Sequence, residues 1–201
     1  MKERPIIMTS ESVRAILDGR KTMTRRVITG FLYPEYPDHE YCFHETVDSR
    51  WEIGMISRST GEGHFMQYSR CPYGVPGSSL WVKESWANNI PGCPNGLSYK
   101  ADHIDPLGDG PAHPMKWKSP IFMPRWASRI TLEVVNVRVE RITDISDSDC
   151  YAEGIISPQN DILGEPYYSF KDLWDTINAK RGYPWASNPW VWVIEFRRVS
   201  P

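Results

Sequence analysis

The amino-acid sequence predicts an α+β protein built on a small mixed β-barrel, with flanking helices and long irregular insertions. Three observations lead to this prediction. Several segments have the alternating or continuous apolar pattern of strands, and only three short segments have a helical period. The chain also contains 17 prolines and 14 glycines, which imply many turns and argue against a helical bundle. Few helices among several strands favour a barrel with helices packed around it.

The length of 201 residues is somewhat greater than that of an average domain. We therefore expect one domain over residues 1–201, with insertions at about 29–77 and 88–124, where Pro and Gly are frequent. Within the first insertion, residues 51–53 and 65–68 have the composition of short strands. Both insertions are otherwise expected to be irregular.

The first element is expected to be a helix over residues 10–18. Thr9 or Ser10 can cap its start, and Gly19 suits the left-handed residue that ends many helices. Residues 20–28 are rich in Thr and β-branched side chains, which predicts an extended segment directly after the helix.

Three further segments are predicted to be strands. They cover residues 80–86, 129–140 and 190–196, and the last is expected to be central because it begins apolar on both faces. In the second strand the apolar residues change parity at Val134 and Val135. A β-bulge there would keep both apolar sets on one buried face, and without a bulge both faces must be covered.

Two more helices are predicted between the last two strands. The first covers residues 146–153 and begins at the capping residue Ser146. The second covers residues 169–178. Its apolar stripe consists of Phe170, Leu173, Trp174 and Ile177.

Simple features exclude several classes of protein. No apolar stretch is long enough for a membrane span, and the apolar run after Arg4 is too short for a signal peptide. The four cysteines form no CxxC pair, so we expect reduced thiols, a cytoplasmic location and no membrane partner. The net charge of −2 excludes a protein that coats nucleic acid through bulk charge.

Charge is nevertheless distributed unevenly along the chain. Residues 1–30 contain seven basic and three acidic residues, whereas residues 142–175 contain one basic and eight acidic residues. The basic region can attract a phosphate-bearing ligand, or it can be part of an ordinary solvated surface.

The segment GRKTMTRR at residues 19–26 places four cations and two hydroxyl groups within eight residues. Arg20, Arg25 and Arg26 can bind a phosphate or the edge of a base, and Lys21 can act in acid–base chemistry. The alternative is a solvated basic strand without a ligand.

This segment, which follows a short amphipathic helix, resembles the signature of the ASCH family in the PUA-like superfamily of small β-barrels. Three other stretches resemble the longer, prophage-encoded members: CPYGVPG (71–77) with LWVKE (80–84), MPRWASRITL (123–132) and NPWVWVIEF (188–196). The resemblance covers about residues 4–199 and implies a PUA-like barrel. Long members usually have Gly-Asp before the LWV strand, where this chain has Gly77 and Ser78.

The resemblance implies binding of RNA or of a nucleoside. Some small ASCH members are amidohydrolases that remove the acetyl group from N4-acetylcytidine, using a Lys, a Thr three residues later and a Glu at the end of a later helix. By resemblance, these catalytic roles fall on Lys21, Thr24 and Glu153. Thr24 would supply the hydroxyl, Lys21 would take its proton, and Glu153 would hold the exocyclic amine or relay a proton. This chemistry requires no cofactor, and we expect none.

Two physical conditions accompany that assignment. The pKa of Lys21 must be lowered from about 10.4, through burial and the neighbouring arginines. In a regular strand, Lys21 and Thr24 would also point to opposite faces, because their separation is odd. Lys21 must therefore lie in a turn before the strand, or a bulge must intervene.

Glu84 and Trp86 are further candidates for substrate binding. Glu84 can face the pocket, or it can form an ion pair with Lys83 or Arg125. Trp86, like Trp126, can stack on a base or belong to the core.

A zinc site is also conceivable, because several potential ligands lie close together in the sequence. They are His39, Cys42, His44, His64 and Cys71. Their spacing fits no common zinc motif, so we expect no metal.

Three functions remain open from the sequence. The first is a nucleoside-binding or RNA-base-binding ASCH domain that acts as a metal-independent amidohydrolase on N4-acylated cytidine. The second is a non-catalytic single-stranded RNA-binding module of phage origin. The third is a phage accessory protein that works through contacts with protein partners of unknown identity.

Overall fold

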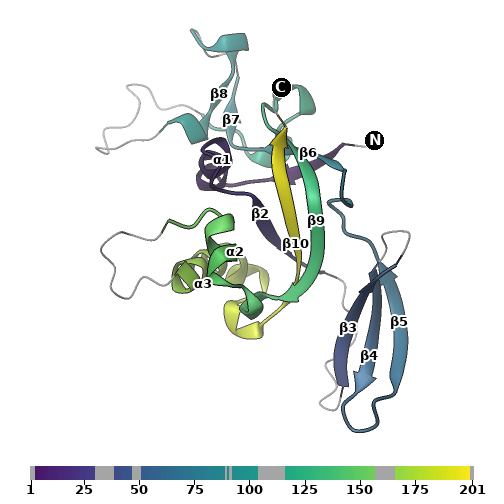
Figure 1. Ribbon diagram of the computed structural model, residues 1–201. Helices are drawn as coiled ribbons and strands as arrows, with labels where there is room; N and C mark the ends of the chain where they lie inside the picture. The colour runs from purple at the N-terminus through teal and green to yellow at the C-terminus, as the bar shows by residue number, and fades with distance from the viewer. Residues whose placement is uncertain are drawn as a thin grey trace.

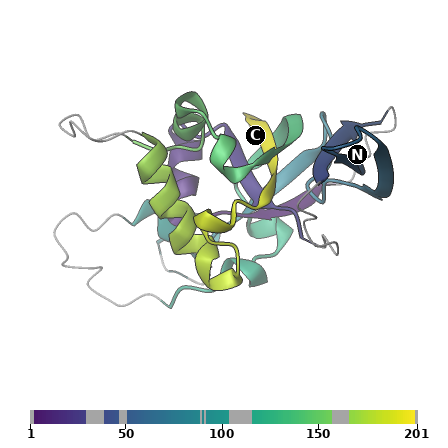
Figure 2. The same cartoon turned by 90° about the horizontal axis from the view of Figure 1, so that it is seen from below.

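The computed structural model describes residues 3–29, 39–46, 51–88, 90, 92–103, 116–156 and 166–199. They form a mixed α+β fold, as predicted. One multi-stranded sheet has α-helices packed against both of its faces, and a smaller sheet is set apart from the helices (Figures 1 and 2).

The main sheet has five strands in the order β1-β6-β9-β10-β2. Their bounds are Arg4–Ile7 (β1), Ser79–Lys83 (β6), Thr131–Arg141 (β9), Trp190–Val199 (β10) and Met23–Val27 (β2). β1 and β6 run parallel, and the other neighbouring strands are antiparallel. β1 and β2 lie at the two edges, so the described strands form an open sheet rather than a closed barrel.

The predicted bulge is present in β9. Between Glu195 of β10 and the residue that follows it, the pairing partner changes from Asn136 to Val134, so Val135 is an extra residue. Val134 and Val137 are buried, and Val135 is half exposed. The bulge therefore keeps Val134 and Val137 on the same buried face, which explains the change of parity.

β10 is a central strand with both faces covered, as predicted. Trp192 and Ile194 belong to the core that includes α1 residues, whereas Val191 and Val193 pack in a second cluster with residues of α2 and α3. Apolar side chains on both faces are thus explained by two separate cores.

The three α-helices are α1 (Ser10–Leu17), α2 (Asp147–Ala152) and α3 (Pro166–Asn178). Thr9 and Ser146 cap α1 and α2 by accepting a hydrogen bond from the backbone N–H three residues later. α3 begins three residues before its predicted start, since proline is well accommodated in the first turn of a helix.

The first insertion contains a three-stranded antiparallel sheet, formed by β3 (His39–Glu45), β4 (Trp51–Ser57) and β5 (Gly63–Ser69). Trp51 contacts Trp192 of the main sheet edge to face, with ring centroids 5.8 Å apart. The short strands predicted at residues 51–53 and 65–68 are therefore confirmed within β4 and β5, whereas the expectation that the rest of this insertion is irregular is wrong for β3. These strands are stabilised by pairing with one another, which a local pattern does not reveal.

The described part of the second insertion is mostly irregular, as predicted. β7 (Trp86–Ala87) pairs with β8 (Ser98–Tyr99), and β6 already ends at Lys83, so the predicted strand 80–86 is divided in two. Short 3-10 helices occupy Pro94–Gly96, Lys100–Asp102, Pro120–Phe122, Arg125–Ala127, Ile142–Asp144, Ala179–Arg181 and Trp185–Ser187. Across the described ranges, no helix has both the length and the apolar character needed to cross a membrane.

Candidate functional site

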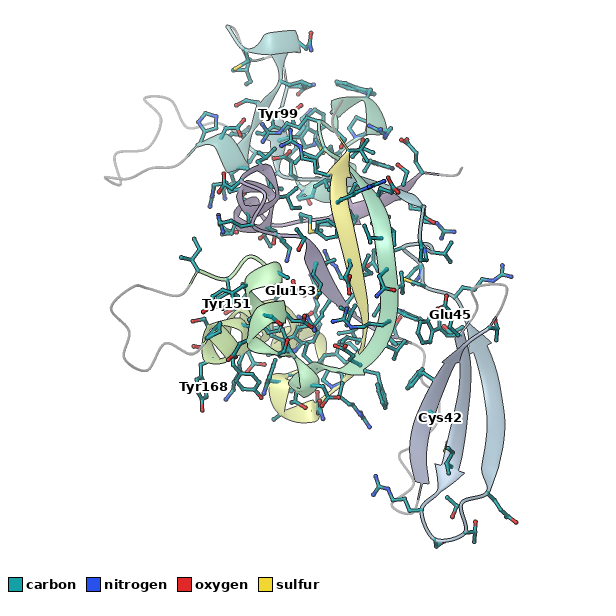
Figure 3. The ribbon with its side chains drawn as sticks, in the orientation of Figure 1. Cys42, Glu45, Tyr99, Tyr151, Glu153 and Tyr168 are labelled. Atoms are coloured by element: carbon teal, nitrogen blue, oxygen red, sulfur yellow. The ribbon has the colours of Figure 1, made fainter. Side chains whose placement is uncertain are left out.

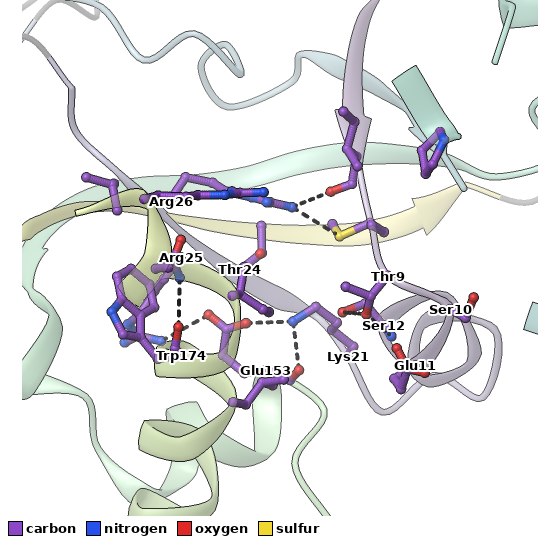
Figure 4. A pocket seen from close by; sticks show the side chains of 18 of the residues that line it. Thr9, Ser10, Glu11, Ser12, Lys21, Thr24, Arg25, Arg26, Glu153 and Trp174 are labelled. Atoms are coloured by element: carbon purple, nitrogen blue, oxygen red, sulfur yellow. Dashed lines mark hydrogen bonds and ion pairs between the residues drawn. The ribbon is translucent and has the colours of Figure 1, made fainter. Parts of the chain in front are cut away.

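A pocket of about 570 Å³ lies between the start of α1, the strand β2 and the helix α3 (Figure 4). The catalytic candidates Lys21, Thr24 and Glu153 all line this pocket. The fold therefore brings the three residues of the ASCH resemblance to one cavity. Its walls also include Arg26, Tyr73, Phe170, Leu173, Trp174, Ile177 and Arg181.

Lys21 lies in the short turn between α1 and β2. Gly19 has a φ of +74°, and the Ala15 carbonyl accepts hydrogen bonds from the N–H groups of Arg20 and Lys21 at 2.8 and 2.9 Å. Because this turn precedes β2, Lys21 does not follow the alternation of the strand and reaches the same pocket as Thr24. The turn resolves the problem of their odd separation.

Glu153 is the residue at the end of α2, and its side chain lies between that helix and the main sheet (Figure 3). Lys21 Nζ donates to Glu153 Oε2 at 2.6 Å and to the Glu153 backbone carbonyl at 2.7 Å (Figure 4). The two side chains are only 4% and 5% exposed. The backbone N–H of Thr22 donates to the Ala152 carbonyl at 2.8 Å, which holds the turn against α2.

Burial is the largest influence on the pKa of Lys21 and lowers it from the ordinary value. Glu153 opposes this shift through its charge and its hydrogen bond, whereas Arg26 and Arg25 lower the pKa further. The ammonium form of Lys21 is therefore less favoured than that of a lysine in water. A larger fraction of neutral amine is available to accept a proton.

Two oxygen atoms of the site lack a hydrogen-bonding partner. Thr24 is 5% exposed and lines the pocket, and its hydroxyl has no hydrogen-bonding partner among the described residues. Glu153 Oε1 is buried without a hydrogen-bond donor, and it forms an ion pair with Arg25 Nη1 at 3.5 Å. The buried Glu153 Oε1 gains free energy when a ligand supplies the missing donor.

Arg25, one of the predicted substrate-binding residues, is enclosed by the protein. Its side chain is 0% exposed and forms ion pairs with Glu140 and Asp149, both of which also bind Arg138. The guanidinium group of Arg25 is therefore already bound by carboxylates of the protein. This geometry favours a role in positioning the neighbouring Glu153 over direct contact with a substrate.

The other two arginines of the motif have different surroundings. Arg20 does not line the pocket, because its guanidinium group binds the Asp18 carboxylate at 2.8 Å and the Gly154 carbonyl at 3.2 Å. Arg26 does line the pocket, and its Nη2 donates to the Ile7 carbonyl at 2.6 Å. Arg25 and Arg26 both line the pocket, and of the two only Arg26 has no carboxylate partner among the described residues.

Glu84 does not line this pocket. It is 1% exposed and accepts two hydrogen bonds from Arg129, at 2.9 and 3.1 Å. The predicted ion-pair partners Lys83 and Arg125 are therefore wrong, because Glu84 leaves the sheet at the end of β6 and turns inward toward the start of β9.

Trp86 is likewise outside the pocket. It is buried in a small cluster with Met123 and Ala127, which agrees with the core alternative. Trp126 is 68% exposed and contacts Trp86 edge to face. Neither ring lies beside the Lys21 amine.

The zinc alternative depends on His39, His44 and His64, whose side chains lie outside the described part of the structure. Among the side chains that are described, no group of three or more potential metal ligands is found.

The wall formed by α3 is the part of the pocket that sequence reasoning missed. Phe170, Leu173, Trp174 and Ile177 form its apolar stripe, and all four line the cavity. The sequence predicted this apolar stripe, but it did not show that the stripe faces the pocket of Lys21, Thr24 and Glu153. Tyr73 and Arg181 join the pocket without any local signal.

Comparisons of the chain with protein-family models, with curated proteins and with solved structures gave no match. The ASCH resemblance therefore rests on the sequence motifs.

Proposed function

We propose that this protein is a PUA-like, ASCH-type amidohydrolase that cleaves the N4-acyl group of a cytidine-type substrate without a metal ion. The observation that carries this proposal is the buried ion pair of Lys21 and Glu153 beside the unpartnered hydroxyl of Thr24, on the wall of one pocket. The pocket volume of about 570 Å³ also lies within the range typical of small-molecule sites.

The first half of the reaction uses Thr24 as the nucleophile. The neutral Lys21 amine takes the hydroxyl proton, and Thr24 Oγ attacks the acyl carbonyl carbon. The tetrahedral intermediate collapses as the C–N bond breaks, and the proton held by Lys21 passes to the departing N4 amine. The acyl group is then an ester of Thr24, and the cytidine-type product leaves with a free N4 amino group.

The second half regenerates the side chain. Water attacks the ester carbonyl while Lys21 accepts a proton from it, and the proton is returned to Thr24 Oγ as the ester C–O bond breaks. The products are a carboxylic acid and the original enzyme. Glu153 keeps Lys21 in place, and its Oε1 accepts a hydrogen bond from the N4–H of the substrate.

The pocket has complementary apolar surface for a flat ring. Phe170 and Trp174 lie on its α3 side, and Tyr73 lies on another wall. Aromatic side chains at these positions can contact the face of a pyrimidine while Glu153 binds its exocyclic nitrogen.

Hydrolysis of N4-acetylcytidine, followed by the change in ultraviolet absorbance, tests this proposal. Thr24→Val and Lys21→Met are expected to lower kcat by about 100- to 10,000-fold, the usual contribution of such groups. Thr22→Val is the matched control, because Thr22 is exposed and does not line the pocket. The proposal fails if the wild-type protein shows no turnover, or if Lys21→Met is as active as wild type. Nucleoside binding without turnover would instead favour the binding module.

A further inference from the structure

Arg26 differs from Arg25, Arg129 and Arg138, three arginines that are also wholly or partly buried. Arg25 and Arg138 each bind several carboxylates, and Arg129 binds Glu84 and a second carboxylate. Arg26 instead donates to neutral groups, which are the backbone carbonyl of Ile7 and the sulfur of Met8. Among the described residues, no carboxylate forms an ion pair with it.

The unpaired guanidinium group of Arg26 is directed at a ligand site. Arg26 lines the pocket and lies on the same face of β2 as Thr24, two residues away (Figure 4). Its Nε is buried without a hydrogen-bond acceptor. A half-buried cation without an anion is unfavourable, and Arg26 lies where a ligand can supply the anion.

A second cation adds to this positive region. Arg181 follows α3, lines the same pocket, and is close enough to Arg26 to act on its charge. Burial is the largest influence on the pKa of Arg26 and lowers it, and Arg181 acts in the same direction, against Tyr73 and Glu153.

The acidic side chains of the pocket do not neutralise this region. The Glu153 side chain forms its ion pair with Lys21, and the Glu11 side chain forms one with Arg14 at 3.3 Å. Neither carboxylate is among the hydrogen-bonding partners of Arg26. Arg26 and Arg181 thus line one cavity, and neither forms an ion pair with a carboxylate among the described residues. The guanidinium group of arginine binds phosphate through pairs of parallel hydrogen bonds.

We propose that the Arg26–Arg181 edge of the pocket is a phosphate subsite, so that the substrate is a phosphorylated nucleoside rather than a free nucleoside. The identity of the base rests on the proposed function, whereas the phosphate preference rests on the arginines alone. The phosphate is that of a mononucleotide or of a nucleotide within an RNA strand, since both present the same anionic oxygens.

The experiment compares three substrates with the whole protein: N4-acetylcytidine, its 5′-monophosphate, and a short RNA with one internal N4-acetylcytidine. We expect the wild-type kcat/KM to be at least roughly tenfold higher for one phosphorylated substrate than for the nucleoside, as bonds to a charged group allow. Whether the mononucleotide or the RNA is preferred identifies the source of the phosphate. Equal kcat/KM values for all three substrates would overturn the proposal.

Two substitutions at adjacent exposed positions locate the subsite. Arg181→Gln should reduce the preference for the phosphorylated substrate several-fold, while Lys180→Gln, which changes a side chain outside the pocket, should keep it. A preference that is the same in both variants and in wild type would refute the assignment. Arg181 is exposed, so its replacement is compatible with folding.

A direct binding measurement separates this inference from the hydrolase proposal. Titration calorimetry with cytidine and cytidine 5′-monophosphate requires no turnover. Tighter binding of the monophosphate, weakened in Arg181→Gln, supports the subsite even if no acyl group is cleaved. Equal affinity for the two ligands contradicts it, whether or not the protein hydrolyses N4-acetylcytidine.

Discussion

Substitution of Gly154 by alanine tests how the turn at Lys21 is held. Gly154 follows Glu153 with a φ of +90°, and an added Cβ would lie 2.9 Å from Ala15 Cβ and 3.2 Å from Lys21 Cβ. The left-handed backbone alone costs an alanine roughly 1–2 kcal/mol. The close contacts add roughly 1–3 kcal/mol, the usual cost of overpacking. We therefore expect Gly154→Ala to lower the free energy of unfolding by about 2–5 kcal/mol.

Gly77→Ala is the matched control for this prediction. Gly77 has a φ of +84°, but an added Cβ would meet no atom within 4 Å. It should lose only the backbone contribution of about 1–2 kcal/mol. At about 2–4 °C per kcal/mol for a chain of this size, the packing contribution separates the two melting temperatures by roughly 2–12 °C.

Urea and thermal unfolding measure the difference in stability, and hydrolysis of N4-acetylcytidine measures the displacement of Lys21. A shift of about 1 Å in a catalytic group can cost roughly 100-fold in rate, so Gly154→Ala should lose most activity while Gly77→Ala keeps it. If Gly154→Ala and Gly77→Ala lose equal stability, the close contacts of the added Cβ at position 154 do not contribute to the loss. That result would refute the prediction that overpacking at Gly154 destabilises the turn.

Three other predictions concern charged groups. Lys21→Met and Glu153→Gln should each lower the free energy of unfolding measured in urea, by up to about 3–5 kcal/mol, because each leaves a buried charge without its partner. The double variant should regain part of the lost stability, but it should not regain turnover. The rate of hydrolysis should rise with pH, and the midpoint of this rise should lie below the ordinary lysine pKa of 10.5, because burial lowers the pKa of Lys21. The free energy of unfolding should rise over the same pH interval, since the unfolded chain binds the lysine proton more tightly than the folded protein does. A midpoint at or above 10.5 in the pH–rate profile would contradict this. Arg129→Met should destabilise the protein by about 3–5 kcal/mol in thermal unfolding, because it leaves Glu84 buried and unpaired, while Arg197→Met, at an exposed ion pair, should cost at most about 1 kcal/mol.

Much of the local structure could be predicted from the sequence. Thr9 and Gly19 mark the bounds of α1 because a cap and a left-handed residue act within one turn of the chain. The parity change at Val135 predicted the bulge, because side chains alternate strictly along a strand. In each case the physical cause lies within a few residues.

Predictions that depended on distant partners were less successful. The strand at residues 39–45 was missed, since it is ordered by pairing with β4 rather than by its own pattern. Glu84 was predicted to pair with Lys83 or Arg125, but it binds Arg129. Arg129 lies beside Glu84 only because β6 and β9 pair in the folded protein. A side chain buried in this way takes the partner that the tertiary fold supplies.

The same division holds at the candidate site. The sequence by itself determined which groups are available, an amine and a hydroxyl in one motif and a carboxylate at a helix end. Only the tertiary structure decided that Lys21 and Glu153 meet in a buried ion pair, and that Arg26 faces the pocket without a carboxylate. The reason is that burial and charge pairing depend on surfaces brought together by packing, and these two properties set the pKa of Lys21 and the chemistry that it can support.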